Sequence, residues 1–254
     1  MLEIAMEQSA CDINCSPNDF LRTENVLVEL NLNETAKKYY YQPINCNFIS
    51  YGNNVVAASD SACRALVKEY ISRFTFYNCF KAPNLFWLEK RLLCLGLGVC
   101  FMAEYYLPDT EKLKPLDCHF KLKKLYAPDF EELYKPEWSN ALCEFRRELD
   151  VLGIGAYDGG KLIGLAGCSA DCGKMWQIGI DVLPEYRQKG VASSLTSRLA
   201  LEILNCGKVP FYCAAWSNIR SIKNAMKSGF VPAWAEMTVK PTHIIDEING
   251  EIQK

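Results

Sequence analysis

Residues 175–205 read MWQIGIDVLPEYRQKGVASSLTSRLALEILN, and this stretch decides the fold. Its first part, Met175–Val182, has the β-branched, aromatic and alternating character of a strand. The next part, Leu183–Tyr186, contains a proline and interrupts that pattern. From Val191 onward apolar residues recur at every fourth position, which predicts a helix that stops near Gly207. The stretch therefore predicts a strand, a loop and a helix in succession.

The loop between the predicted strand and helix is suited to an anion. It reads Arg187-Gln188-Lys189-Gly190-Val191-Ala192. The first amides of a helix have no intrahelical partner and carry about half a positive charge, so the backbone from Gly190 to Ser193 can hold phosphate groups. Gly190 has no Cβ and lets oxygen atoms approach, while Arg187 and Lys189 add positive charge. We expect a pyrophosphate here. An ordinary helix start is the alternative, because a short glycine-containing turn is a weak signal alone.

The spacing Arg-x-x-Gly-x-Ala resembles the acetyl-CoA loop of the GNAT superfamily of N-acetyltransferases, Arg/Gln-x-x-Gly-x-Gly/Ala. The matching residues are Arg187, Gly190 and Ala192. Downstream, Asn218-Ile219-Arg220-Ser221 and Lys227-Ser228-Gly229-Phe230 resemble the family's next motif, after a short predicted strand at 210–214. The resemblance covers about residues 118–242. It implies direct transfer of acetyl from acetyl-CoA to an amine.

The resemblance also implies which residues contact acetyl-CoA. In relatives the strand before the loop splays away from its neighbour, and its free main-chain groups bind the pantetheine and the acetyl carbonyl; by position these are Ile180 and Val182. Asn218 contacts the pantetheine arm or caps the following helix, and the two roles are compatible. The implied cofactor-binding residues are Ile180, Val182, Arg187, Gln188, Lys189, Gly190, Val191, Ala192, Ser193 and Asn218.

The chemistry requires a neutral amine. For an amine with a pKa of about 10.4, roughly one molecule in 10^3 to 10^4 is neutral at pH 7, a cost of about 4–5 kcal/mol that a base, a water relay or a desolvating pocket must reduce. Asp181 and Glu185 are the candidate bases, although each is also an ordinary turn or surface carboxylate. Where many relatives carry a Tyr as general acid, this sequence has Ala225.

Two classes of function therefore stay open. One is an acetyl-CoA-dependent N-acetyltransferase acting on a primary amine of a small molecule or peptide. The other is a catalytically silent acetyl-CoA-binding sensor or assembly module, which the missing Tyr and the missing obvious base favour. A different acyl-CoA donor is a third, weaker option.

The sequence around the loop predicts an α/β (α+β) fold. Residues 151–156 and 161–167 are strand-like runs joined by an Asp-Gly-Gly turn, and a third strand begins at Met175. Two further strands are expected around Phe211 and at 236–239. Together these give the GNAT fold, with a mixed, mostly antiparallel central sheet flanked by helices.

The chain is longer than one such domain, and a polar, proline-containing stretch at 106–117 reads as a linker. We therefore expect an N-terminal α/β module at 1–117 and the GNAT acetyltransferase domain at 118–254. The first module has a predicted hairpin at 48–58, helices near 66–74 and 84–97, and a strand at 99–106. This organisation resembles a two-domain, zwittermicin-resistance-like subgroup. The module could shape the acceptor pocket, mediate dimerisation or be a degenerate copy of the catalytic fold.

The composition of the chain narrows the classes of binding partner that we expect. The formal charge of −2 and the dispersed basic residues give no reason to expect nucleic acid. Thirteen cysteines scattered through apolar runs indicate reduced thiols in the cytoplasm, no four-ligand Cys/His set suggests a metal, and no apolar run is long enough to span a membrane. The expected partner is a small-molecule or peptide amine, with a homodimer as an option. Acceptor specificity is expected in the helical segment 128–149 and the loops around Ser169.

Overall fold

The computed structural model describes residues 1–31, 34–38 and 43–250. The chain forms two compact units. One contains residues 105–232 together with Met1, and the other, called here the amino-terminal unit, contains 2–104 and the chain from Ala233 onward. Two strands, β4 (Leu97–Pro108) and β10 (Phe230–Pro241), pass from one unit into the other.

The sequence did not predict this division. It placed one boundary after residue 117, whereas the compact units meet at Glu104–Tyr105 and again at Pro232–Ala233. The return of the chain to the amino-terminal unit depends on pairing between β10 and β2 (Cys46–Ser50), which are distant in sequence. As folding domains, 1–117 and 118–254 remain a prediction.

The 105–232 unit is built on a mixed sheet with the strand order β4-β9-β8-β7-β6-β5. Strands β5 to β8 pair antiparallel with their neighbours, and β8 pairs parallel with β9. The predicted meander and the α/β fold class are thereby confirmed. The elements are β5 (Lys121–Tyr126), η4 (Ala127–Leu133), η5 (Pro136–Trp138), η6 (Glu144–Leu149), β6 (Asp150–Asp158), β7 (Lys161–Ser169), β8 (Met175–Val182), η7 (Pro184–Tyr186), α5 (Val191–Asn205), β9 (Val209–Ala215) and α6 (Ile219–Lys227).

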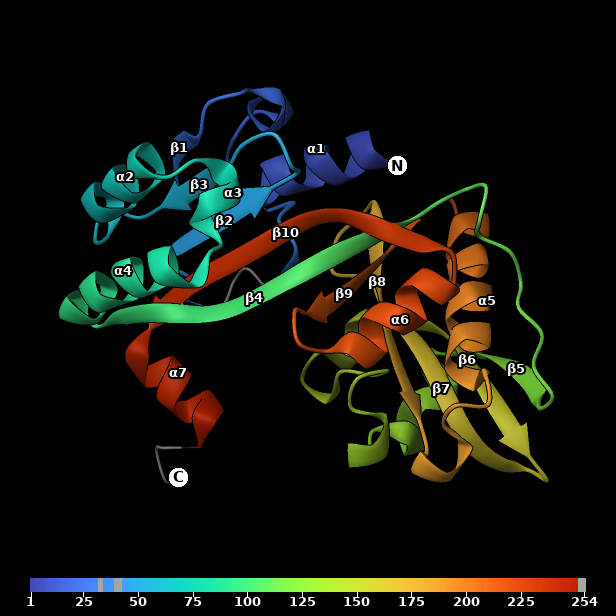
Figure 1. Cartoon of the computed structure of the whole chain (residues 1–254). Helices are drawn as coiled ribbons and strands as arrows, with labels where there is room; N and C mark the ends of the chain where they lie inside the picture. Colours follow the sequence, from blue (N-terminus) through green and yellow to red (C-terminus); the bar gives the residue numbers. More distant parts are fainter. Residues whose placement is uncertain (32–33, 39–42, 251–254) are drawn as a thin grey trace. The chain divides into compact units, whose positions relative to one another are not determined.

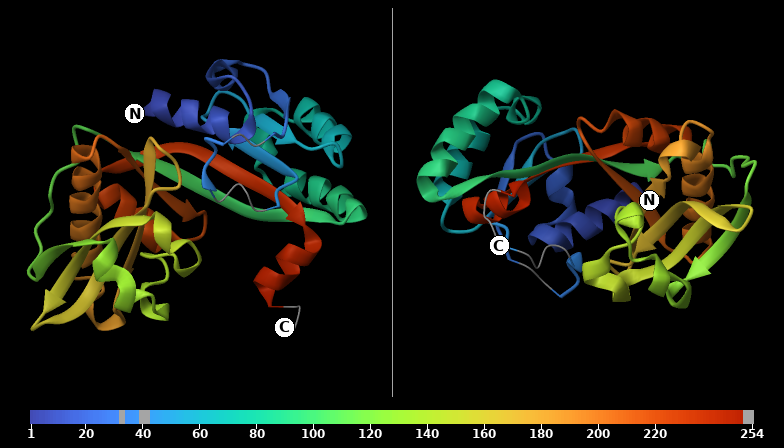
Figure 2. Two further views of the ribbon diagram at one scale, coloured as in Figure 1. Left: turned by 180° about the vertical axis from the view of Figure 1, so that it is seen from behind. Right: turned by 90° about the horizontal axis from the view of Figure 1, so that it is seen from below.

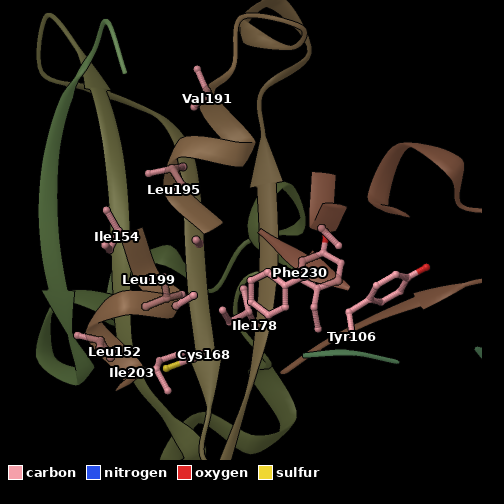
Figure 3. Close-up of a cluster of buried hydrophobic side chains, with 14 of the residues drawn as sticks. Tyr106, Leu152, Ile154, Cys168, Ile178, Val191, Leu195, Leu199, Ile203 and Phe230 are labelled. Carbon is pink, nitrogen blue, oxygen red and sulfur yellow. The ribbon is translucent and has the colours of Figure 1, made fainter. Parts of the chain in front are cut away.

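Helix α5 buries its predicted apolar stripe on one face of this sheet (Figure 3). Its residues at intervals of four, Val191, Leu195, Leu199 and Ile203, are all buried. They pack with residues of β6, β7 and β8 such as Ile178. Fully burying an aliphatic side chain of this size contributes roughly 1.5–3 kcal/mol. The helix is therefore held by its contacts with the sheet, and its first turn is fixed at the end of β8.

The opposite face of the sheet carries a row of three glycines. Gly153 pairs with Gly167, and Gly167 pairs with Gly179, so the three lie side by side across β6, β7 and β8. An ideal Cβ on Gly179 would overlap the carbonyl oxygen of Asn140, and one on Gly167 would overlap that of Ala141. The absence of side chains lets the chain at 140–141 lie directly on the sheet.

The segment that crosses this glycine row was expected to be helical over 128–149, and it is helical only in three short 3-10 turns. Figure 2 shows these turns and α5 on the two sides of the strands. Pro128 and Pro136 begin the first two turns, where their fixed φ is compatible with a helix start. Between the turns the backbone follows the flat glycine surface, which a continuous helix could not approach so closely.

The amino-terminal unit is also α/β, with the strand order β1-β3-β2-β10-β4. The predicted hairpin is confirmed as β2 and β3, which pair antiparallel. The predicted second helix ends earlier than expected, because Gly96 adopts a left-handed conformation after a 3-10 turn. The elements are α1 (Leu2–Ile13), η1 (Pro17–Leu21), β1 (Val26–Glu29), β2 (Cys46–Ser50), β3 (Val56–Ser59), α2 (Arg64–Arg73), α3 (Phe76–Cys79), α4 (Ala82–Leu92), η3 (Leu93–Leu95) and α7 (Thr242–Asn249).

Candidate cofactor-binding site

The loop before α5 has an unusual backbone. Gln188 has φ +62° although it is not glycine, and Gly190 has φ +79°. Only a few per cent of non-glycine residues adopt positive φ, and left-handed residues are common in backbone concavities that bind anions. Arg187 is extended and donates from its Nε to the carbonyl oxygen of Val182 at 3.0 Å. That hydrogen bond ties the loop back to the end of β8.

The start of α5 is open. Gly190 is the N-cap residue, and no described side chain caps it. The first intrahelical hydrogen bond found here is donated by the amide of Ser194 to the carbonyl oxygen of Gly190, so the amides of Val191, Ala192 and Ser193 precede the helical ladder. The described first turn contains no acidic residue. Its partial positive charge is therefore not neutralised by a carboxylate of the helix itself.

The space in front of Gly190 is also open. An ideal Cβ at this position meets no described atom within 4 Å. The cationic side chains of Arg187 and Lys189 are exposed beside it, with the Lys189 Nζ 5.1 Å from the Tyr186 ring centroid. The predicted phosphate-binding residues from Arg187 to Ser193 thus share one loop and helix start. This donor set fits a pyrophosphate.

The edge of β8 next to this loop is partly unpaired. Strands β8 and β9 pair through four positions, from Met175–Val209 to Ile178–Tyr212. Beyond that point Gly179–Val182 continue to pair with β7 but have no β9 partner in the described register. The two parallel strands therefore separate after Ile178, as the sequence resemblance implied.

The direction of the unpaired groups follows from the ladder. The amide of Leu183 donates to the carbonyl oxygen of Ile163 on β7. Main-chain groups of alternate residues in an antiparallel pair point the same way, so Asp181 also faces β7. The main-chain groups of Ile180 and Val182 consequently face the side of β9, where the Val182 carbonyl oxygen already accepts from the Arg187 Nε. These are the two residues expected to act through main-chain atoms.

The second motif begins α6. Asn218 is the N-cap residue of this helix, and its Oδ1 accepts from the amide of Ser221 at 3.1 Å. The capping role is therefore confirmed, and the pantetheine contact stays a prediction. Ala225 is fully buried in the core below this helix. The Tyr212 hydroxyl lies 2.8 Å from the Ser221 Oγ, and burial raises the pKa of this phenol.

The two candidate bases have different surroundings. Asp181 is half-buried, and its carboxylate accepts from the amide of Asn140 at 2.8 Å, the Asn140 Nδ2 at 2.7 Å and the amide of Ala141 at 3.0 Å. Burial raises the pKa of Asp181, and these hydrogen bonds oppose the rise. Glu185 is exposed and pairs with Lys161 at 3.1 Å. A hydrogen bond to its own backbone amide, helped by Lys161, lowers the pKa of Glu185.

The sequence missed Asn140, Ala141 and Asp150. Asp150, at the start of β6, accepts from the amide of Cys143 at 2.8 Å and the hydroxyl of Tyr134 at 3.3 Å. Burial raises the pKa of Asp150 to about 6. Together with Asp181 it fastens the segment 134–143 onto the sheet. No local sequence pattern signals these contacts, because each joins residues of separate elements.

A family model for GNAT acetyltransferases matches residues 101–234, more than half of the chain. The chain therefore belongs to the GNAT acetyltransferase family, which confirms the expected superfamily. No curated protein matches the sequence. The expected zwittermicin-resistance-like subgroup remains a prediction.

Many solved structures are similar to this chain. A GNAT-family acetyltransferase from Novosphingobium aromaticivorans is 18% identical, with a TM-score of 0.46 over 57% of this chain and 66% of that one, just under two thirds. A GCN5-related N-acetyltransferase-like protein from Streptococcus suis is 20% identical, with a TM-score of 0.46 over 63% of this chain and 68% of that one. A GCN5-related N-acetyltransferase from Kribbella flavida is 11% identical, with a TM-score of 0.47 over 95% of both chains.

The described residues provide neither a metal site nor a membrane-spanning helix. No group of three or more His, Cys, Asp or Glu among them is placed to hold a metal ion. No helix in the described ranges is both long enough and apolar enough to cross a membrane. All thirteen cysteines are free thiols.

Proposed function

We propose that this chain is an acetyl-CoA-dependent N-acetyltransferase that acts on a primary amine of a small molecule or peptide. The observation that carries the proposal is the open start of α5 beside the unpaired edge of β8. The first holds anions and the second holds amide-like groups, and a coenzyme A thioester contains both in sequence.

Each part of the site has a role in this proposal. Backbone amides from Gly190 to Ser193 bind the pyrophosphate, with Arg187, Gln188 and Lys189 forming the loop around it. Main-chain groups of Ile180 and Val182 bind the pantetheine and polarise the acetyl carbonyl. Asn218 contacts the pantetheine arm while it caps α6.

The reaction is a direct displacement. A neutral amine nitrogen attacks the acetyl carbonyl carbon, the carbon–sulfur bond breaks, and the nitrogen loses one proton while the thiolate gains one. The oxygen that becomes negative in the tetrahedral intermediate is stabilised by the main-chain amides of β8. Ala225 cannot donate a proton, so solvent or the departing amine proton protonates the thiolate. Asp181 and Glu185 remain the candidate bases.

A second function is supported by a specific observation. Ala225 is fully buried where many relatives carry a Tyr acid, and Glu185 is tied to Lys161 at the surface. A catalytically silent acetyl-CoA-binding sensor or assembly module would need neither group. The two proposals share the cofactor site and differ in turnover.

A thiol-release assay with a panel of amines separates them. The enzyme proposal expects coenzyme A release above the hydrolysis background with at least one primary amine. Tight acetyl-CoA binding without release in the presence of any amine would support the silent module. Replacing acetyl-CoA by longer acyl-CoA donors tests the third option in the same assay.

We also propose that the protein works in a reducing compartment, the cytoplasm, as a monomer or homodimer. The support is the thirteen free thiols, several of them buried, such as Cys46 and Cys168. Neither nucleic acid nor membrane is a proposed partner.

A further inference from the structure

We propose that the turn at residues 139–142 forms the acceptor-side wall of the active site, and that Asp181 is the residue that positions it. This inference rests on the proposed function, because the turn can contact an acceptor amine only if the protein is an acetyltransferase. The contacts on which it depends do not: Asp181 alone accepts three hydrogen bonds from Asn140 and Ala141.

The first step is the direction from which an amine can attack. A carbonyl oxygen that accepts from main-chain amides lies near their plane, here the plane of the sheet at Ile180 and Val182. The amine attacks the acetyl carbonyl carbon from above or below the thioester plane, and an amine beside this edge of β8 can arrive from either face of the sheet. One of the two faces is filled by α5 and the core around Ile178 and Leu195. The amine must come from the other face.

The second step is what covers the other face. Side chains alternate along β8, so Gly179 and Asp181 point away from α5. On that side the carbonyl oxygens of Asn140 and Ala141 lie against Gly179 and Gly167. Ser139 and Asn140 are exposed, whereas Trp138 and Leu142 on either side are buried. The turn is thus anchored at both ends and presents only its tip to solvent, next to the unpaired edge of β8.

The third step is what fixes the tip. Both carboxylate oxygens of Asp181 are used, one by the Asn140 side chain and one by the amides of Asn140 and Ala141. Asp181 lies between Ile180 and Val182, whose main-chain groups face the gap to β9. One side chain therefore sets the distance between the wall and the strand that would hold the acetyl group.

This role differs from that of a general base. A base must be able to take a proton from the amine, whereas all the geometry of Asp181 is directed at the turn. In the proposed role the Asp181 carboxylate must accept hydrogen bonds from the turn throughout the reaction, and it takes no proton from the amine. Loss of the carboxylate should then loosen acceptor binding before it affects the chemical step.

The test compares Asp181→Ala, Asp181→Asn and Asn140→Ala with the control Glu132→Gln, which removes a charge from an exposed position of η4. We expect Asp181→Ala to raise the KM for the acceptor at least tenfold while the Kd for acetyl-CoA changes less than twofold. Asp181→Asn keeps one accepting oxygen and should recover part of the loss. Asn140→Ala should raise the acceptor KM about as much as Asp181→Asn does. The control Glu132→Gln should have the KM and Kd of the wild type.

A second readout does not need turnover. Hydrogen exchange at the amides of Asn140 and Ala141 should accelerate at least tenfold in Asp181→Ala, with the amides of the α5 core unchanged. Unchanged exchange there would overturn the inference. A fall in kcat with constant acceptor KM and a shifted pH–rate profile would also overturn it, in favour of Asp181 as the base. If the wild type shows no turnover with any amine, the proposed function fails and the acceptor wall with it, while the exchange rates still decide whether Asp181 holds the turn.

Discussion

Two helix starts in this molecule, that of α5 in the 105–232 unit and that of α2 in the amino-terminal unit, differ in whether a carboxylate accepts from the turn that leads into the helix. Both helices follow a strand through a short loop. At α2 the carboxylate of Asp60 accepts from the amides of Ala62 and Cys63 at 2.9 and 3.3 Å. At α5 a glycine stands at the N-cap, and no described side chain accepts from the first turn.

The difference teaches what makes a helix start a binding site. The positive end of the helix is common to both, so the dipole alone does not select a ligand. What differs is whether the chain supplies its own anion. Asp60 places a carboxylate in the turn before α2, whereas no described side chain caps α5, and Gly190 leaves room there for the external anion that we propose.

Gly190→Asp is expected to have the largest effect, because it converts the open start into a closed one. A carboxylate about 4 Å from one phosphate charge costs about 4 kcal/mol at an effective dielectric of about 20. The affinity for acetyl-CoA should fall more than about tenfold, and turnover with it. Isothermal titration calorimetry on the folded variant gives the Kd. Gly159→Asp is the matched control, because Gly159 also has positive φ and no described atom within 4 Å of its Cβ position; equal losses in both variants would contradict the account.

Asp150→Asn extends the comparison to a buried carboxylate, which accepts a hydrogen bond from the main-chain amide of Cys143. Since burial raises the folded pKa of Asp150 to about 6, folding favours its protonated form, and its contribution weakens as pH rises from about 4 to about 6. This window corresponds to up to about 3 kcal/mol at about 1.4 kcal/mol per pH unit. Urea unfolding at pH 4 to 7 should show that the difference in stability between wild type and Asp150→Asn changes across the window. A difference independent of pH would show that the ionised carboxylate is not penalised.

Gly179→Ala contrasts a filled glycine position with the open one at Gly190. An added methyl at 179 overlaps the Asn140 carbonyl, and overpacking of this kind typically costs about 1–3 kcal/mol. The loss should appear as a lower urea midpoint with an unchanged m-value. Gly173→Ala is the control, since its Cβ position has no described neighbour within 4 Å. Equal stabilities of the two variants would mean that 140–141 does not lie on the glycine row.

Asp60→Ala removes the carboxylate from the turn before α2 and has the smallest expected effect. Loss of a carboxylate that accepts from two amides beside a helix start costs about 1 kcal/mol, so the free energy of unfolding should fall by that amount. The variant should bind no additional acetyl-CoA, because α2 has no glycine loop before it. A second binding event in calorimetry would show that an unoccupied helix start is sufficient, against the account.

Much of the 105–232 unit could be predicted from the sequence because its signals are local. The alternation in Met175–Val182 and the four-residue spacing from Val191 predicted the strand and the helix, and the loop between them remains the candidate cofactor site. The separation of β8 from β9 followed from the family resemblance. The resemblance also implied that Ala225 occupies the position where many relatives carry a Tyr acid.

The rest of the fold and of the candidate site depends on the register between paired strands, which the sequence of a single segment does not reveal. Gly153, Gly167 and Gly179 are separated by twelve to fourteen residues, and only the pairing of three strands places them in one row. The prediction of a helix at 128–149 was wrong for that reason. Residues 140–141, in the middle of this segment, pack as a non-helical turn against the row of glycines. The roles of Asp181 and Asp150 as acceptors for this turn depend on the same contacts.

The most direct test of the central claim is an NMR titration of the isotopically labelled protein with acetyl-CoA. The account predicts that the amides of Gly190, Val191, Ala192 and Ser193 shift strongly and saturate together, while the Asp60-capped amides of Ala62 and Cys63 stay in place. Saturation of the protein with acetyl-CoA while the four α5 amides remain unshifted would contradict it.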